Sequence, residues 1–359
     1  MAKHALLESL KTEYPILLAP LGGGPGTPEL AAAVSEAGGL GALGAAYLTA
    51  AQTREAIRKV SSLTRKPFQV NLFCGGREAG RPFEAGPMLA LLAEVHQKLG
   101  LPAPVLPDMP ADPFPAQFEV VLEERPAAFS FTFGIPDPEA MQRLKAAGIL
   151  VLGTATTVEE GRRLQKAGVD AIVAQGAEAG AHRGTFAGSF ETSMVPLAEL
   201  VREIVLECSI PVVAAGGIMD GGDIAAALAN GAEAVQLGTA FLASSESGAS
   251  DAYKRAILAA RKDTTVITRA FSGKPARGLA NTFIEKLAGR EEIILPYPLQ
   301  NALTRPMRTA AAQLGDAGYL SLWAGQGVPR ARSLPAGELV RVLMAELHDA
   351  QAKQAHAPR

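Results

Sequence analysis

The sequence has few cysteines and lacks a long hydrophobic run. Cys74 and Cys208 are the only cysteines among 359 residues, and they stand far apart without the spacing of metal ligands. We therefore expect a reducing compartment, no disulfide framework and no metal site. The longest apolar runs are broken by polar residues such as Gln236 before they reach membrane-spanning length, and residues 1–13 have no apolar signal-peptide core. These absences predict a cytoplasmic protein.

The sequence also lacks an excess of charge of one sign. It has 36 acidic and 34 basic residues, for a formal net charge of −2. Such a balance creates no field that would concentrate nucleic acid or an anionic membrane, so neither is expected as a partner. We expect a small-molecule ligand and a monomer or homodimer. The length suits about two domains of roughly 150 residues, or one α/β barrel with an insertion.

Short apolar segments alternate with helical segments over most of the chain. Gly148, Gly168 and Gly231 each fit the turn between the end of a helix and the start of a strand. The predicted helices include 28–37, 53–63, 138–147, 158–167 and 222–229. The eight predicted strands are 16–19, 40–43, 68–72, 127–131, 149–152, 170–174, 211–215 and 234–237. This alternation predicts an α/β fold, a (β/α)8 TIM barrel.

Two segments interrupt or follow this pattern. Eight prolines are scattered between Pro82 and Pro115 around one helical piece at 88–99. We therefore predict that residues 74–117 form an insertion over the barrel mouth. Beyond the barrel, made of 1–73 and 118–262, an irregular region precedes a last helix at 336–351. Residues 263–359 are predicted to be a C-terminal extension that forms a small cap on the substrate side.

The most informative stretch is residues 170–186, which read DAIVAQGAEAGAHRGTF. It is a buried-type strand that leads into a glycine-rich loop with one histidine, His182. In barrels of this class the active site lies at the C-terminal ends of the strands, where this loop is expected. His182 between Gly180 and Gly184 is a candidate for proton transfer or anion binding, since imidazole changes charge near neutral pH. The alternative is a surface histidine without a role.

Two further loops predict a phosphate site. Ala215–Gly–Gly–Ile218 follows the seventh strand, and Gln236–Leu–Gly–Thr239 follows the eighth. In such barrels these two loops, with the N-terminus of a following helix, present backbone N–H groups to a phosphate. Gly217 and Gly238 allow close approach, and Thr239 adds a hydroxyl. No GxGxxG pattern links the first strand to its helix, which argues against a Rossmann dinucleotide site.

Polar side chains at other strand ends suggest a heterocycle beside the phosphate. Asn71 and Gln175 are amides where apolar residues would suffice for packing, and an amide offers both a donor and an acceptor. Capping of nearby backbone is the alternative for each. Glu178 and Arg183 are interpreted as a solvated or structural pair.

Several motifs resemble the first class of the nitronate monooxygenase family, formerly called 2-nitropropane dioxygenases. These are FMN enzymes with a (β/α)8 barrel. The matching motifs span nearly the whole chain, from Ala19–Pro–Leu–Gly22 and Val70–Asn–Leu–Phe73 through Phe129–Ser–Phe–Thr–Phe–Gly134, the stretch 175–184, Ala214–Ala–Gly–Gly–Ile218 and 236–241, to Phe271–Ser–Gly273, Pro275–Ala–Arg–Gly278, Tyr297–Pro–Leu299 with Asn301, and Trp323–Ala–Gly–Gln326.

The resemblance implies oxidation of an alkyl nitronate, such as propionate 3-nitronate, by O2 to an aldehyde or ketone plus nitrite. It implies His182 as the catalytic residue beside the flavin. Leu21 stands where a methionine is common in the family, and Ala181 where the loop often has a second glycine, so substrate preference is open. The residues implied to contact FMN are Leu21, Gly22, Asn71, Gln175, Gly180, Gly217, Gln236, Leu237, Gly238 and Thr239.

Other functions remain open at this point. An NAD(P)H:quinone reductase or an FMN-dependent enoyl-thioester reductase would share the flavin barrel. Inosine-monophosphate dehydrogenases have similar glycine loops but need a nucleophilic cysteine, and Cys74 and Cys208 are both misplaced for that role. A non-catalytic flavin or phosphate sensor is a further alternative. His182 argues against a sensor, because storing a ligand needs no titrating group.

Overall fold

The eight predicted strands form one parallel sheet that closes into a barrel. The computed structural model describes residues 5–356 apart from 79, 81 and 263. The strand order is β1-β9-β8-β6-β5-β4-β3-β2, and a bridge between Leu17 and Leu40 joins the two outer strands. The (β/α)8 prediction is confirmed. The strands are β1 (Ile16–Leu18), β2 (Gly41–Gly44), β3 (Phe68–Phe73), β4 (Ala128–Thr132), β5 (Leu150–Ala155), β6 (Ala171–Gln175), β8 (Val212–Ala215) and β9 (Ala234–Leu237).

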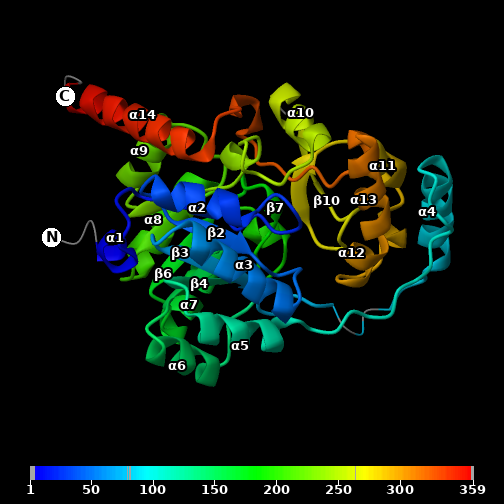
Figure 1. The fold of residues 1–359 in the computed structure, drawn as a ribbon, viewed down its shortest axis with the longest axis horizontal. Helices are drawn as coiled ribbons and strands as arrows, with labels where there is room; N and C mark the ends of the chain where they lie inside the picture. Colours follow the sequence, from blue (N-terminus) through cyan, green and yellow to red (C-terminus); the bar gives the residue numbers. More distant parts are fainter. Residues whose placement is uncertain (1–4, 79, 81, 263, 357–359) are drawn as a thin grey trace.

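Helices surround the barrel, and one of them differs from the prediction (Figure 1). The helix α5 begins at Phe114, inside the proline-rich stretch predicted as insertion. Pro115 lies in its first turn, where the missing N–H would have no partner in any case, so proline starts this helix instead of breaking it. The helices around the barrel are α1 (Ala5–Leu10), α2 (Pro28–Glu36), α3 (Ala50–Leu63), α5 (Phe114–Glu124), α6 (Pro138–Ala146), α7 (Val158–Ala167), α8 (Leu197–Glu207), α9 (Gly221–Ala229) and α14 (Ala336–His356).

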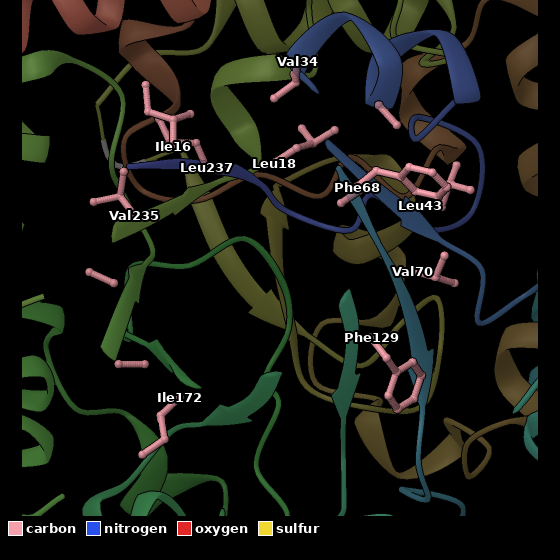
Figure 2. Close-up of a cluster of buried hydrophobic side chains, with 14 of the residues drawn as sticks. Ile16, Leu18, Val34, Leu43, Phe68, Val70, Phe129, Ile172, Val235 and Leu237 are labelled. Atoms are coloured by element: carbon pink, nitrogen blue, oxygen red, sulfur yellow. The ribbon is translucent and has the colours of Figure 1, made fainter. Parts of the chain in front are cut away.

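Both faces of the barrel strands are buried. Alternate side chains point outward and pack under the helices, as Leu18 does near Val34 of α2 (Figure 2). The intervening residues Leu17, Leu152 and Val173 belong to a separate inner cluster that includes Leu10 of α1. Burial on two faces explains why most of the strands are largely apolar, although β3 also carries the buried amides Gln69 and Asn71. The labelled outward residues are Ile16, Leu18, Leu43, Phe68, Val70, Phe129, Ile172, Val235 and Leu237.

A second hydrophobic core joins the insertion to the C-terminal region. Met88 and Leu92 of α4 share a cluster with Phe271, Phe283 and Met307. In Figure 1, α4 lies at the right-hand edge, beyond the C-terminal helices. By contrast, α14 packs against α9 and α2 of the barrel. The division of the chain into domains stays a prediction. The helices of this part are α4 (Gly86–Lys98), α10 (Asp251–Ala259), α11 (Thr282–Leu287), α12 (Leu299–Leu303) and α13 (Arg305–Leu314).

The region after the barrel contains a small sheet, where the sequence suggested irregular structure. Strands β10 (Thr265–Thr268) and β11 (Ala276–Leu279) are antiparallel, and β11 also pairs with β7 (Ala181–His182). This pairing places Ala276 opposite His182, so the C-terminal region holds the histidine loop directly. Short 3-10 helices occur at Glu191–Ser193, Thr239–Phe241, Glu291–Ile293, Ala317–Tyr319 and Val328–Arg330. No helix in the described ranges is long and apolar enough to cross a membrane.

Candidate active site

One cavity lies at the C-terminal ends of the barrel strands, and all eleven predicted site residues line it. The cavity has about 1200 Å³ of empty space, including its open mouth. The residues brought together are Leu21, Gly22, Asn71, Gln175, Gly180, His182, Gly217, Gln236, Leu237, Gly238 and Thr239. Their individual roles stay predictions.

The two glycine loops meet on one side of this cavity. Gly216 and Gly217 have φ values of 126° and 72°, a conformation that favours glycine. No hydrogen bond with a described residue is found for the backbone N–H of Gly217 or of Thr239. The Thr239 hydroxyl accepts a bond from the N–H of Gly325 at 3.0 Å. Because glycine has no side chain to block them, these unpaired N–H groups form a surface that suits an anion such as phosphate.

The start of helix α9 is not available to that anion. The Asp220 carboxylate accepts from the N–H of Asp223, and the Asp223 carboxylate accepts from the N–H of Met219. Glu346 of α14 accepts from the N–H of Gly221 at 2.9 Å. Three carboxylates therefore occupy this helix terminus. Instead, the helix N-terminus that faces the cavity is that of the short 3-10 helix at Thr239–Phe241, which directly follows Gly238.

The amides at the strand ends differ in what they leave for a ligand. Gln175 donates from Nε2 to the carbonyl of His182 at 2.9 Å and accepts at Oε1 from the N–H of Gly184 at 2.8 Å. The Gln175 amide therefore connects the histidine loop to strand β6 through two hydrogen bonds. Asn71 donates to the Ser130 hydroxyl at 3.0 Å. For the Gln236 side chain no hydrogen bond is found within the described chain, so its donor and acceptor remain for a ligand.

Four aromatic rings surround His182. Its Nε2 is 2.8 Å from the hydroxyl of Ser272. Burial, followed by the nearby charges of Lys274 and Arg308, lowers its pKa from 6.5 to about 3. The imidazole is therefore neutral at pH 7 and can act as a base or a hydrogen-bond donor, but not as a standing cation. The ring centroids of Phe73, Phe133, Tyr297 and Trp323 lie 6.3, 5.9, 6.4 and 5.6 Å from that of His182.

Two residues outside the cavity lining, which the sequence analysis did not single out, place positive charge near His182. The Lys274 ammonium lies 4.9 Å from the ring centroid of Phe133 and 5.9 Å from that of Tyr297. Burial lowers the pKa of Lys274. Burial also lowers the pKa of Arg308 to about 10, which leaves its guanidinium charged at pH 7. Neither residue belongs to a local pattern that predicts this placement.

Two buried ionic side chains hold the histidine loop in place. Glu160 accepts at Oε1 from the N–H groups of Phe186 and Ala187, and at Oε2 from the N–H and hydroxyl of Thr156. This role of Glu160 could not be predicted from the sequence, because Thr157 and Glu160 have the spacing of an ordinary capping box. Arg183 donates to the carbonyls of Gly176, Gln175 and Ser193 at 2.6, 3.0 and 2.5 Å. Arg183 is buried, so of its two predicted readings the structural one is confirmed and the solvated one is wrong.

The loop is also constrained by its backbone. Ala181 has a φ of 61°, in the left-handed region that favours glycine. Gly180 allows the segment around Gly325 to approach, because a Cβ at position 180 would lie 2.5 Å from the Gly325 nitrogen. Residues 178–182 are thus enclosed between the barrel and the C-terminal region. In the described ranges, no group of three or more His, Cys, Asp or Glu residues is arranged to hold a metal ion.

Comparisons with known proteins agree with this geometry. A family model described as nitronate monooxygenase matches residues 3–346. A probable nitronate monooxygenase of Staphylococcus aureus strain Newman is 42% identical over 347 residues, covering 96% of this chain and 98% of that protein. The structure of nitroalkane oxidase from Streptomyces ansochromogenes is similar with a TM-score of 0.90 and 45% identity, over 98% of this chain and 99% of that one. FabK from Thermotoga maritima has a TM-score of 0.77 and 31% identity over 98% of both chains.

Proposed function

The chain belongs to the nitronate monooxygenase family, and from this membership we propose that it oxidises alkyl nitronates with O2 to an aldehyde or ketone plus nitrite, using noncovalently bound FMN. The family is flavin-dependent, and the protein is an oxidoreductase. The observation that carries the proposal is that unpaired N–H groups of the glycine loops and a neutral, half-buried histidine line one cavity.

The residues present fit FMN. The N–H groups of Gly217 and Thr239 would hold its phosphate. The N-terminus of α9, which carboxylates already occupy, is not needed for this. Asn71 and Gln236 would face polar edges of the ring system, while Gln175 keeps its own amide in the histidine loop. When bound, FMN supplies a two-electron acceptor that O2 can reoxidise. Leu21 and Gly22 line the same cavity and would pack against the cofactor.

The protein's own side chains would bind and orient the nitronate. A nitronate is already a carbanion equivalent, so its oxidation requires no strong base. It requires hydrogen bonds and positive charge that hold the anion and stabilise the changing charge distribution. Neutral His182 can donate one hydrogen bond or accept a proton, while Ser272 fixes its ring at 2.8 Å. Lys274 and Arg308 supply the positive charge, and the aromatic rings around His182 exclude water.

Two measurements test the proposal. Denaturing the purified protein should release FMN into the supernatant; if no flavin is released, and added FMN does not bind, the cofactor assignment is wrong. The flavin-loaded protein should then bleach on anaerobic mixing with a nitronate. Rapid bleaching by NADH or NADPH without a response to nitronate would favour the quinone or enoyl-thioester reductase. Bound flavin that reacts with none of these would favour the sensor.

A further inference from the structure

Two arginines of the C-terminal region hold carbonyl groups of the glycine loop that follows strand β8. Arg330 donates from Nη2 to the carbonyl oxygen of Gly217 at 3.2 Å, and Arg332 donates from Nη2 to that of Met219 at 2.7 Å. Gly217 and Met219 line the active-site cavity, whereas the two arginines do not. The guanidinium groups therefore hold this loop from outside the cavity.

The bond from Arg330 also sets the direction of an N–H group. In the trans peptide between Gly217 and Ile218, the C=O and the N–H point in opposite directions. The carbonyl of Gly217 faces Arg330, so the N–H of Ile218 points away from Arg330. Ile218 lines the cavity, and no hydrogen bond with a described residue is found for its N–H. This N–H is therefore available to an anion in the cavity.

The same two arginines neutralise the carboxylates beside the loop. Nη1 of Arg330 lies 2.6 Å from the carboxylate of Asp220 and 2.8 Å from that of Asp223. Nη1 of Arg332 lies 2.6 Å from the carboxylate of Glu346. These are the carboxylates that occupy the start of α9. Without the guanidinium groups, three unpaired negative charges would lie next to the loop and would weaken the binding of an anion there.

Gly327 allows the C-terminal region to come this close. A Cβ at position 327 would lie 2.5 Å from the carbonyl oxygen of Gly217 and 2.5 Å from Cγ of Met219. The φ of Gly327 is −74°, which residues other than glycine also adopt. Glycine is therefore required at this position by the contact with the loop and not by the local backbone conformation.

We propose that Arg330 and Arg332 are positioning residues for the phosphate of FMN: they orient the N–H groups of the loop 216–219 and neutralise the carboxylates behind it. This inference rests on the proposed function and deepens it, because it makes the affinity for the cofactor depend on the C-terminal region. Riboflavin has the same ring system as FMN but lacks the phosphate. Loss of either arginine therefore weakens the binding of FMN and leaves that of riboflavin nearly unchanged.

The test measures the preference of the protein for FMN over riboflavin. The FMN-loaded protein is equilibrated with mixtures of the two flavins, and the bound flavin is released by denaturation and separated by chromatography. Arg330→Met should lower the preference for FMN about tenfold or more, as expected for the loss of a charge-assisted hydrogen bond, and should change the affinity for riboflavin by less than about threefold. Arg330→Lys should recover part of the preference, because lysine keeps the charge but not the paired donors.

The matched control is Arg162→Met. Arg162 contacts the carboxylate of Glu207 at 2.8 Å, and no bond from it to a described backbone carbonyl is found. Removal of this exposed guanidinium should change the preference for FMN by less than about twofold. An unchanged preference in Arg330→Met, or an equal fall in Arg162→Met, would overturn the proposal.

A second variant applies if Arg330→Met does not fold. Gly327→Ala keeps both arginines, but its methyl group displaces the carbonyl of Gly217, so the preference for FMN should again fall about tenfold. A preference equal to that of the unaltered protein would contradict the inference. Unaltered protein that binds no FMN refutes the proposed cofactor, whereas a preference for FMN that survives in these variants refutes only the role of the arginines.

Discussion

The substitution Glu160→Gln tests whether the buried carboxylate holds the histidine loop. Glu160 is fully buried and accepts four hydrogen bonds, two at each oxygen. Glutamine has the same shape but only one acceptor oxygen, so its NH2 group must face two donors. Losing two bonds to a charged acceptor, at roughly 1.5–3 kcal/mol each, should lower the free energy of unfolding by about 3–6 kcal/mol. Flavin retention should fall too, since residues 182–187 lose their anchor.

The measurement is equilibrium unfolding in urea at pH 7, at a fixed concentration of added FMN. The midpoint should fall while the slope with urea stays unchanged, because the same surface is exposed on unfolding. Glu159→Gln is the matched control: this neighbour is exposed and pairs with Arg163 at 2.8 Å, one turn along the helix, so its removal should cost less than about 0.5 kcal/mol. A loss below about 1 kcal/mol in Glu160→Gln would show that the loop is held by its other contacts.

Four further predictions concern the loop itself. His182→Asn should keep FMN but lower nitronate turnover by roughly 10²-fold or more in steady-state oxygen consumption; wild-type turnover with full flavin would refute a catalytic role. Because the pKa of His182 is about 3, kcat/KM should show no histidine inflection between pH 6 and 8, and an inflection near 6.5 that is lost in His182→Asn would contradict this. In the unfolded state of the flavin-free protein, His182 binds a proton below its pKa of about 6.5, whereas in the folded state it does not. The free energy of unfolding should therefore fall as the pH decreases below about 6.5, by at most about 1.4 kcal/mol per pH unit relative to His182→Asn. Ala181→Gly should raise the free energy of unfolding by about 0.5–1 kcal/mol, because glycine removes roughly 1–2 kcal/mol of left-handed strain and loses part of it to backbone entropy; a lower urea midpoint would show that the loop is not strained.

The barrel and the cofactor end of the site could be predicted from the sequence because their signals are local. Each strand is a short apolar run bounded by turn residues, and the β–α alternation leaves few topologies open. Gly217 and Gly238 stand directly after strands seven and eight, so their place at the barrel's C-terminal face follows from the strand order alone. His182 could be selected for the same reason, since it follows the sixth strand within a glycine-rich loop.

The chemistry around His182 was decided only by the tertiary structure. Strand β11 pairs with β7 across more than ninety residues of sequence, and no local pattern indicates a contact between such distant segments. The neutral state of His182 depends on burial and on Lys274 and Arg308, and desolvation depends on the assembled surroundings of a group. Glu160 reads as a surface capping residue, yet folding buries it under the loop. Periodicity and turn residues therefore determined where the site is, while long-range packing determined its charges and its partners.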